Sequence, residues 1–126
     1  MSDRGFERLE VFQRAYRVSL EVHRASLDFP AAEQRALADQ LRRATKSIPA
    51  NLAEGHGRES ASPAAWRHHI AIALGSADEV RVWIRYARDL GYIDDATWRR
   101  WRDAYGEIAR MLKGLWSSAE RSSKQT

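Results

Sequence analysis

Apolar residues recur along the chain at helical spacing, and the strict alternation that is typical of β-strands is absent. The two clearest lines step by three and four residues. One comprises Trp66, Ile70, Ala73, Ala77, Val80, Ile84 and Ala87, and the other comprises Trp98, Trp101, Tyr105, Ile108, Leu112, Leu115 and Ala119. Such spacing places side chains along one seam between nearly parallel helices. The upstream lines are Leu37, Leu41, Ala44 and Ile48, and Leu9, Phe12, Tyr16, Leu20 and His23, widened by Val11, Ala15, Val18 and Val22.

Cap and turn residues divide these lines into four predicted helices, over residues 8–28, 30–55, 63–90 and 95–119. Pro30 is expected at the start of the second helix and Ser62 as the cap of the third. Gly55 and Gly57 are expected to close the second helix, and Gly91 the third. The connections are short, so neighbouring helices must run antiparallel. The sequence therefore predicts an all-α fold, a left-handed up-down-up-down four-helix bundle in a single domain, residues 1–126, with a frayed tail after the last helix.

The third predicted helix carries a second apolar line on the side away from its seam. This line comprises Ile72, Gly75, Val82 and Tyr86, with Glu79 completing the spacing and Trp83 flanking the inner seam. A helix that is apolar on two sides needs one partner inside the fold and another outside it. We therefore predict a homo-oligomer whose interface includes Ile72, Gly75, Val82, Trp83 and Tyr86. Scattered surface apolar residues are the alternative.

The stretch "ATKSIPANLAEGHGR", residues 44–58, interrupts a regular apolar line with polar residues. Pro49 lacks a backbone donor and is expected to bend the helix. Asn51 falls on the seam and Glu54 beside it, and a buried amide needs a hydrogen-bond partner. The candidate partners are Arg43, Arg58 and the hydroxyl of Ser47. A polar network of Ser47, Asn51 and Glu54 is expected to be either structural or a binding site, and a small-ligand pocket at the bend is a further possibility.

Composition narrows the class of protein. Hydrophobic residues make up 44% of the chain and charged residues 30%, as in a folded soluble domain. Cysteine is absent, which excludes disulfides and cysteine-based metal or catalytic sites. No signal peptide or membrane span is recognisable, so a cytoplasmic location is expected. The net charge of +4 and pI near 9.8 favour polyanionic partners.

Basic residues on the outer helix faces are the candidate nucleic-acid contacts. They are Arg35, Arg42, Arg43, Lys46, Arg58, Arg99, Arg110 and Lys113. Acidic residues interrupt each basic face, so an ordinary solvated surface is the alternative. The sequence contains no element for reading bases, and any binding is expected to be weakly sequence-specific.

The usual signatures of catalysis are missing from the sequence. There is no Glu-x-x-His pair for a di-iron centre, no nucleophile elbow and no phosphate-binding glycine loop. We therefore predict no catalytic residues, no metal, no cofactor and no enzymatic activity. Of the five tryptophans, Trp66, Trp98 and Trp101 are expected in the core, and Trp83 and Trp116 at a subunit interface.

Four motifs in order carry a resemblance to a known family. "LEVFQRA", "FPAAE", "QLRRATKSIPANLAEGHGR" and "IALGSADEV" resemble the 23S rRNA-intervening-sequence proteins over about residues 9 to 118. The resemblance implies a four-helix bundle that assembles into homopentamers, with a link to ribosomal RNA by genetic context. The fold is similar to that of the accessory variability protein of diversity-generating retroelements, a basic pentamer that binds a reverse transcriptase and nucleic acid.

The family signature maps onto particular positions of this chain. They are Arg43, Ser47, Pro49, Asn51, Glu54, Gly55 and Arg58, with Gly75, Ser76 and Glu79 downstream. The segment "AWRHHIAI", with His68 and His69, departs from the aromatic-rich lead of the family. Together, residues and resemblance predict a non-catalytic, homo-oligomeric binding or scaffold module that associates with RNA or a ribonucleoprotein, and the resemblance implies that the oligomer is a pentamer. A protein–protein adaptor without nucleic-acid affinity is the alternative.

Overall fold

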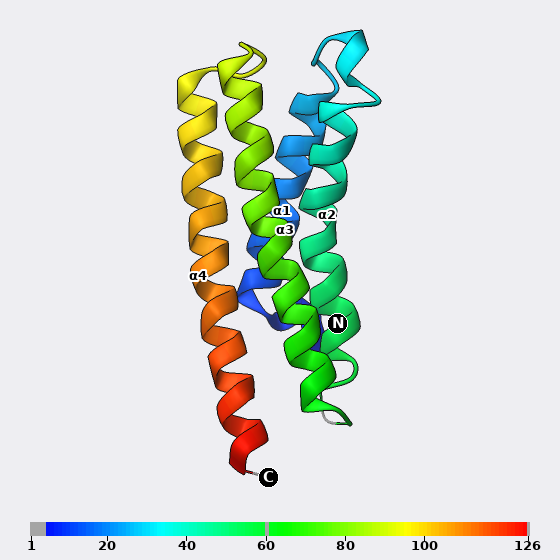
Figure 1. The fold of residues 1–126 in the computed structure, drawn as a ribbon, viewed down its shortest axis with the longest axis vertical. Coiled ribbons are helices and arrows are strands. Elements are labelled where there is room, and N and C mark those ends of the chain that lie inside the picture. Colours follow the sequence, from blue (N-terminus) through cyan, green and yellow to red (C-terminus); the bar gives the residue numbers. More distant parts are fainter. Residues whose placement is uncertain (1–4, 60, 126) are drawn as a thin grey trace.

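A computed structural model describes residues 5–59 and 61–125, with side chains as far as residue 121. The described residues form four α-helices and no strand. The helices are α1 (Glu10–Ser26), α2 (Leu37–His56), α3 (Pro63–Asp89) and α4 (Asp95–Gln125), with short 3₁₀ turns η1 (Gly5–Arg8) and η2 (Ala31–Glu33). Figure 1 shows the four helices packed along one long axis. The predicted all-α four-helix bundle is confirmed.

Each helix packs against two others in the bundle. α1 contacts α2 and α4, and α3 also contacts α2 and α4, so α1 and α3 lie diagonally opposite each other. Side-chain contacts give the relative directions of α2 and α3. Ser47 meets Ser76, whereas Asn51, further along α2, meets His69, which lies earlier on α3. The two helices therefore run antiparallel, as Figure 1 also shows.

The core follows the predicted apolar lines of α2 and α3. The buried residues on these lines are Leu37, Leu41, Ala44, Ile48, Trp66, Ile70, Ala73, Ala77, Val80, Ile84 and Ala87. On α4 the line is buried at Trp101, Tyr105, Ile108, Leu112 and Ala119, and partly buried at Trp98 and Leu115. Burying apolar surface is the main favourable contribution to folding, so these lines define the interior that holds the helices together.

The first helix confirms only part of its predicted seam: Val11, Ala15 and Val22 are buried, whereas two residues of the central line are exposed. Tyr16 is 50% exposed and Leu20 is also exposed, although both were expected on the inner seam. The buried line comprises Val11, Ala15, Ser19, Val22 and Ser26. Serine fits there because each hydroxyl donates to a carbonyl of its own helix at 2.7 Å. Small side chains allow a close helix approach, and the bulky residues face outward.

The second helix begins later than predicted. Residues 30–36 form η2 and a turn, and α2 starts at Leu37. The Gln34 side chain explains the delay, because its Nε2 donates to the carbonyls of Ser26 (2.9 Å) and Phe29 (3.0 Å) at the end of α1. Glu33 then accepts from the backbone N–H of Leu37. The start of α2 is therefore satisfied by a side chain of the preceding turn.

Most of the other predicted boundaries agree closely with the structure, with one larger difference at the end of α4. Ser62 caps α3 by accepting from Ala65 N–H at 3.1 Å, and Gly91 follows α3 with a φ of 80°. In contrast, α4 continues to Gln125, because no glycine or proline interrupts it after residue 119. Pro49 lies inside α2, which is helical on both sides of it. No helix in the described part of the chain has the length and hydropathy that a membrane crossing requires.

Candidate functional site

A polar network joins α2 to α3 at the signature stretch. Asn51 Nδ2 donates to the Ser47 carbonyl (2.8 Å) and to its hydroxyl (3.1 Å). Ser76 Oγ donates to Ser47 Oγ at 2.8 Å, and His69 Nδ1 lies 2.9 Å from Asn51 Oδ1. Because the Asn51 amide nitrogen is the donor to Ser47, its oxygen accepts, and His69 Nδ1 carries the proton. Both helices therefore satisfy each other's polar groups.

The prediction for this network is partly right and partly wrong. Ser47 does satisfy Asn51, but Glu54 is exposed and pairs with Arg58 at 3.3 Å. Arg43 pairs with Asp39 at 2.8 Å instead of with the network. These three charged groups stay outside the seam because an exposed ion pair avoids the cost of desolvation. The partners that take their place come from α3.

His69 is the residue that sequence reasoning missed in this network. It is 7% exposed and lies seven residues before Ser76, so the two share one face of α3. The heptad spacing between a histidine and a signature serine was the available signal. This spacing identifies His69 only if it is also known that this face of α3 contacts Asn51, and the spacing alone does not show that contact.

Gly55 lets α2 and α3 approach each other beside the network. A Cβ at this position would lie 2.5 Å from His69 Cβ and 2.9 Å from Trp66 Cε3. Distances this short are not compatible with normal van der Waals contact, so only glycine fits without movement of the helices. Gly55 was expected to end α2, but it lies within the helix and acts through packing.

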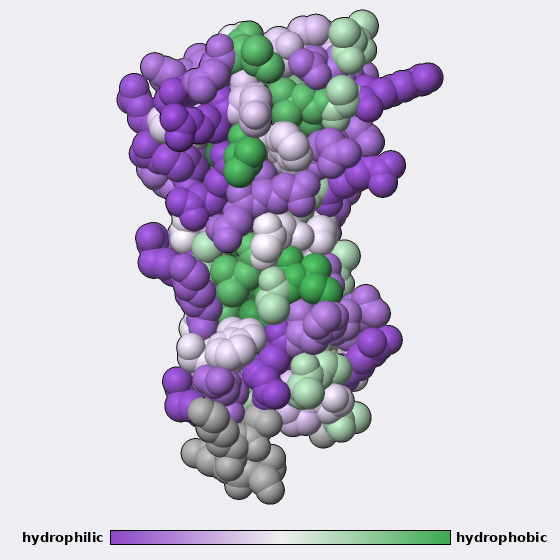
Figure 2. Space-filling model, in the orientation of Figure 1, coloured by the Kyte–Doolittle hydropathy of each residue, from purple (hydrophilic) through white to green (hydrophobic). Residues whose placement is uncertain are grey.

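The outer face of α3 is apolar and exposed, as the sequence indicated. Ile72 is 38% exposed, Val82 50% and Tyr86 54%, and a Cβ added at Gly75 would meet nothing within 4 Å. Trp83 is partly buried and donates from Nε1 to Glu79 at 2.9 Å. Figure 2 shows apolar surface at mid-height and near one end of this face, separated by polar rows. The structure shows a surface that is available for contact, and the interface itself stays a prediction.

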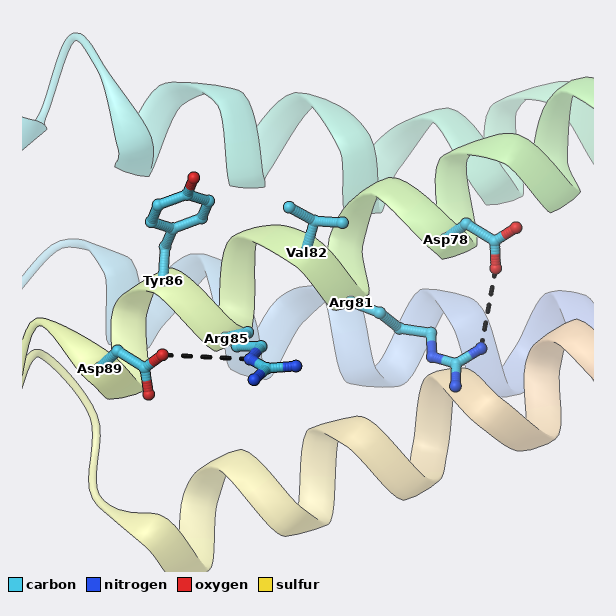
Figure 3. A pocket seen from close by; sticks show the side chains of 6 residues that line it. All are labelled: Asp78, Arg81, Val82, Arg85, Tyr86 and Asp89. Carbon is cyan, nitrogen blue, oxygen red and sulfur yellow. Dashed lines mark ion pairs between the residues drawn. The ribbon is translucent and has the colours of Figure 1, made fainter.

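A shallow depression of about 590 Å³ runs along the second half of this face. It is lined by Asp78, Arg81, Val82, Arg85, Tyr86 and Asp89. Figure 3 shows Val82 and Tyr86 pointing to one side of α3, whereas the ion pairs Asp78–Arg81 and Arg85–Asp89 lie on the other. The charged groups neutralise one another, so Val82 and Tyr86 form the distinctive feature of this surface.

A second apolar depression lies between α1 and α2, and its lining includes Pro49, the position at which the sequence left a small-ligand pocket open. Its volume is about 530 Å³. It is lined by Phe6, Phe12, Tyr16, Ser19, Leu20, His23, Lys46, Pro49, Ala50 and Ala53. Proline and alanine on α2 leave room beside the bulkier side chains of α1, and this difference in size hollows the surface into a groove. We call it the α1–α2 groove.

His23 lies in the wall of the α1–α2 groove. Its Nδ1 is buried and has no hydrogen-bond partner in the part of the chain that the structure describes. Burial lowers the pKa of His23, and the positive charges of Lys46, Arg42 and Arg24 lower it further. The imidazole is therefore held in its neutral form, and Lys46 is the cationic group that lines the groove.

The predicted basic residues are spread over several surfaces. Four are in exposed ion pairs with an acid about one helical turn away in the chain: Arg43–Asp39, Arg58–Glu54, Arg99–Asp95 and Arg110–Glu107. Arg42 is not on an outer face, because it donates to Ser26 Oγ (2.8 Å) and to Gln34 (3.2 and 3.0 Å). Arg35, Lys46 and Lys113 are exposed and have no ion pair within the described residues.

The seam between α1 and α4 is held by a charged group. Glu21 accepts from Trp101 Nε1 at 2.9 Å and from Arg100 Nε at 3.0 Å. Burial raises the pKa of Glu21, but the hydrogen bonds from Arg100 and Trp101 and the Arg100 charge outweigh it, so the net shift is downward. The Tyr105 hydroxyl is buried without a partner nearby, and burial together with the Glu21 charge raises its pKa.

The described residues contain no group of three histidine, cysteine or acidic side chains arranged to hold a metal ion. The features that stand out are therefore the α2–α3 polar network, the outer face of α3 and the α1–α2 groove. The first is internal, whereas the other two are open surfaces.

The sequence matches the 23S rRNA-intervening sequence proteins over residues 7–114. The chain belongs to this family. The matched range includes the polar network, Gly55 and the outer face of α3. No curated protein matches the chain.

A solved structure supports the same fold. The chain is similar to a protein of unknown function from the S23 ribosomal protein family of Bacteroides thetaiotaomicron, with a TM-score of 0.75 and 22% sequence identity. The similarity covers 85% of this chain and 95% of the other. At this identity the likeness shows the fold alone, which agrees with the family assignment.

Proposed function

We propose that this member of the 23S rRNA-intervening sequence family is a non-catalytic, homo-oligomeric binding module whose partner is RNA or a ribonucleoprotein. The observation that carries the proposal is the exposed apolar face of α3, with Val82 and Tyr86 each at least half exposed. A monomer rarely leaves such a line of large side chains in water. Self-association through this face covers it and brings several basic chains together. A pentamer is the subunit number that the family resemblance favours.

Binding of RNA follows from the charge that assembly accumulates. Each chain contributes a net charge of +4, and among the described residues Arg35 and Lys113 have no acid partner to neutralise them. A modest cationic surface becomes a strong one when several copies contact one polyanion. The family name links related proteins to ribosomal RNA, and this supports RNA as the polyanion.

The experiment is a binding titration with a structured fragment of 23S rRNA, at about 50 mM and about 200 mM salt. We expect affinity to fall steeply with salt. The double variant Arg35→Gln, Lys113→Gln should bind more weakly, with a salt slope smaller by about one for each phosphate contact removed. Arg43→Gln is the matched control, since Asp39 already neutralises that arginine. Undetectable binding at the lower salt concentration would sink the RNA proposal.

A protein–protein adaptor is the second candidate, and one observation favours it. Arg43, Arg58, Arg99 and Arg110 are already paired with acids, which reduces the free positive charge on the helix faces. An adaptor would oligomerise without binding RNA at either salt concentration. The mass of the protein in solution and the titration together separate these two functions.

A further inference from the structure

The exposed large apolar side chains of the described residues fall on two lines. One line follows α1 and comprises Tyr16, Leu20 and Leu27, the last directly after the helix. The other follows α3 and comprises Ile72, Val82, Tyr86 and Leu90, again ending directly after the helix. Because α1 and α3 are diagonal in the bundle, the two lines lie on different sides of the molecule.

The two lines also differ in shape. The α1 line forms a wall of the α1–α2 groove, in which Pro49, Ala50 and Ala53 leave space beside Tyr16 and Leu20. The α3 line projects from a single helix at the edge of the shallow depression described above, and Figure 3 shows Val82 and Tyr86 standing out from that helix, away from the ion pairs. A ridge and a groove are complementary shapes, and helices pack by placing ridges into grooves.

We infer that the α3 ridge of one copy packs into the α1–α2 groove of the next copy, in a head-to-tail contact. The inference rests on the self-association proposed above and specifies its geometry. A two-fold contact that uses the α3 face in both copies would leave the α1 line of each copy in water. A head-to-tail contact covers both lines in every copy, and it closes into a ring when the rotation allows.

Charge supports this pairing of surfaces. Lys46 lines the groove and has no ion pair within the described residues. Glu79 lies on the α3 ridge, and its described partner is the neutral indole N–H of Trp83. Among the described residues, the groove therefore carries a cation without an ion pair, Lys46, and the ridge carries an anion without an ion pair, Glu79. These are the two surfaces that would meet.

The heights of the two charges along the bundle also agree. The hydrogen bond between Ser47 Oγ and Ser76 Oγ places these two residues at one level of the antiparallel helices. Lys46 lies one residue from Ser47, and Glu79 lies three residues from Ser76 in the same direction along the axis. At 1.5 Å per residue the offset between the two charges is about 3 Å. A ring whose axis is parallel to the bundle keeps this height, so Glu79 of one copy meets Lys46 of the next.

The first test reverses these charges. Lys46→Glu and Glu79→Lys should each weaken association about tenfold or more, measured by sedimentation velocity over a concentration series, and the double variant should restore it. A role of Glu79 inside its own chain would not be rescued by a change at Lys46. Lys113→Glu, on α4 away from both surfaces, is the control for net charge.

The second test separates a head-to-tail contact from a two-fold one. Tyr86→Glu damages the ridge and Leu20→Glu damages the groove, so each variant alone should sediment as a monomer of 14.4 kDa. Mixed, they keep one intact ridge and one intact groove, and should form a particle of twice the chain mass that grows no further. Thermal unfolding of each variant checks that the bundle has formed.

The outcomes distinguish the contact from self-association itself. A wild-type protein that stays at 14.4 kDa at high micromolar concentration would refute the proposed homo-oligomer, and the contact with it. If the wild type assembles but the charge-reversed pair is not rescued and the mixed variants stay monomeric, the head-to-tail contact is wrong while the homo-oligomer stands. RNA binding that Lys46→Glu abolishes without any change in mass would assign the groove to RNA instead.

Discussion

The seam between α2 and α3 and the seams that α1 makes with α2 and α4 are built in different ways. At the α2–α3 seam, Gly55 permits close approach, and the α3 partners of Asn51 and Ser47, which are His69 and Ser76, are buried. At the α1–α4 seam, the main polar group is Glu21, which remains partly exposed beside Arg100. Shielded hydrogen bonds and tight packing respond strongly to mutation, whereas exposed ion pairs respond weakly. Mutations at the α2–α3 seam should therefore lower the free energy of unfolding more than mutations at the α1–α4 seam.

The largest effect is expected at Gly55. Gly55→Ala places a methyl group 2.5 Å from His69 Cβ, so α2 and α3 must separate. We expect the free energy of unfolding to fall by about 3 kcal/mol, as measured by chemical denaturation. Gly114→Ala is the matched control, because nothing lies within 4 Å of its added Cβ. That change should raise stability by about 0.5–1 kcal/mol through better helix propensity. Equal effects at the two sites would contradict a tight seam.

The next effect is expected at the polar network itself. Asn51→Ala removes the acceptor of His69 Nδ1 and a donor to Ser47, and should cost about 2 kcal/mol. His69→Phe removes the other partner of the same bond. In a double-mutant cycle the two losses should be clearly less than additive, since either change breaks the Asn51–His69 bond. Strict additivity would show that the two residues do not interact.

A smaller effect is expected at the α1–α4 seam. Glu21→Ala leaves the indole N–H of buried Trp101 without its acceptor, and should cost about 1 kcal/mol because water can partly replace it. Glu21→Gln keeps an oxygen for Trp101 and loses only the exposed pair with Arg100, so it should cost less. Denaturation at low and high salt provides the check. A loss at Glu21→Gln as large as at Asn51→Ala would remove the distinction between the seams.

The smallest effect is expected from pH on the α1 side. The pKa of His23 is lowered in the fold from its ordinary 6.5, so the unfolded chain binds the proton more readily. Stability should be fully present above pH 6.5 and fall as pH drops below it. In the His23→Phe variant, the free energy of unfolding should depend less on pH in this range. The pKa of Glu21 is also lowered, from 4.5, so its contribution is lost only at lower pH, as pH falls below that value. Unfolding measured from about pH 7.5 to about pH 3 separates the two windows.

The sequence indicated most of the α3 side of the fold. Every residue of the predicted inner line from Trp66 to Ala87 is buried, and the outer line of Ile72, Val82 and Tyr86 is exposed. Both follow from a clear helical period in which two apolar faces are separated by charged residues. For α1 the same reasoning was right for Val11, Ala15 and Val22 but wrong for Tyr16 and Leu20, because apolar residues occupy most sides of that helix. Period alone cannot say which of them faces the core.

The candidate site was predicted in its signature residues but not in its connections. Ser47 and Asn51 were recognised as members of a polar network, whereas His69 was missed and Glu54 was assigned to the network wrongly. The basic residues were recognised by type, but the inward turn of Arg42 toward Ser26 depends on the loop between α1 and α2. The contacts of His69 and Arg42 join residues that are far apart in the chain, whereas Glu54 pairs with its near neighbour Arg58.

The amino-acid sequence by itself determined the helices, their caps and the lines that α2, α3 and α4 bury, because these depend on neighbours within about one helical turn. Only the tertiary structure decided which side of α1 faces inward, why position 55 must be glycine, and that a groove opens beside Lys46. These features depend on the distance between two packed helices. The sizes of the side chains on both helices determine that distance, so it cannot be predicted from the apolar period of one helix.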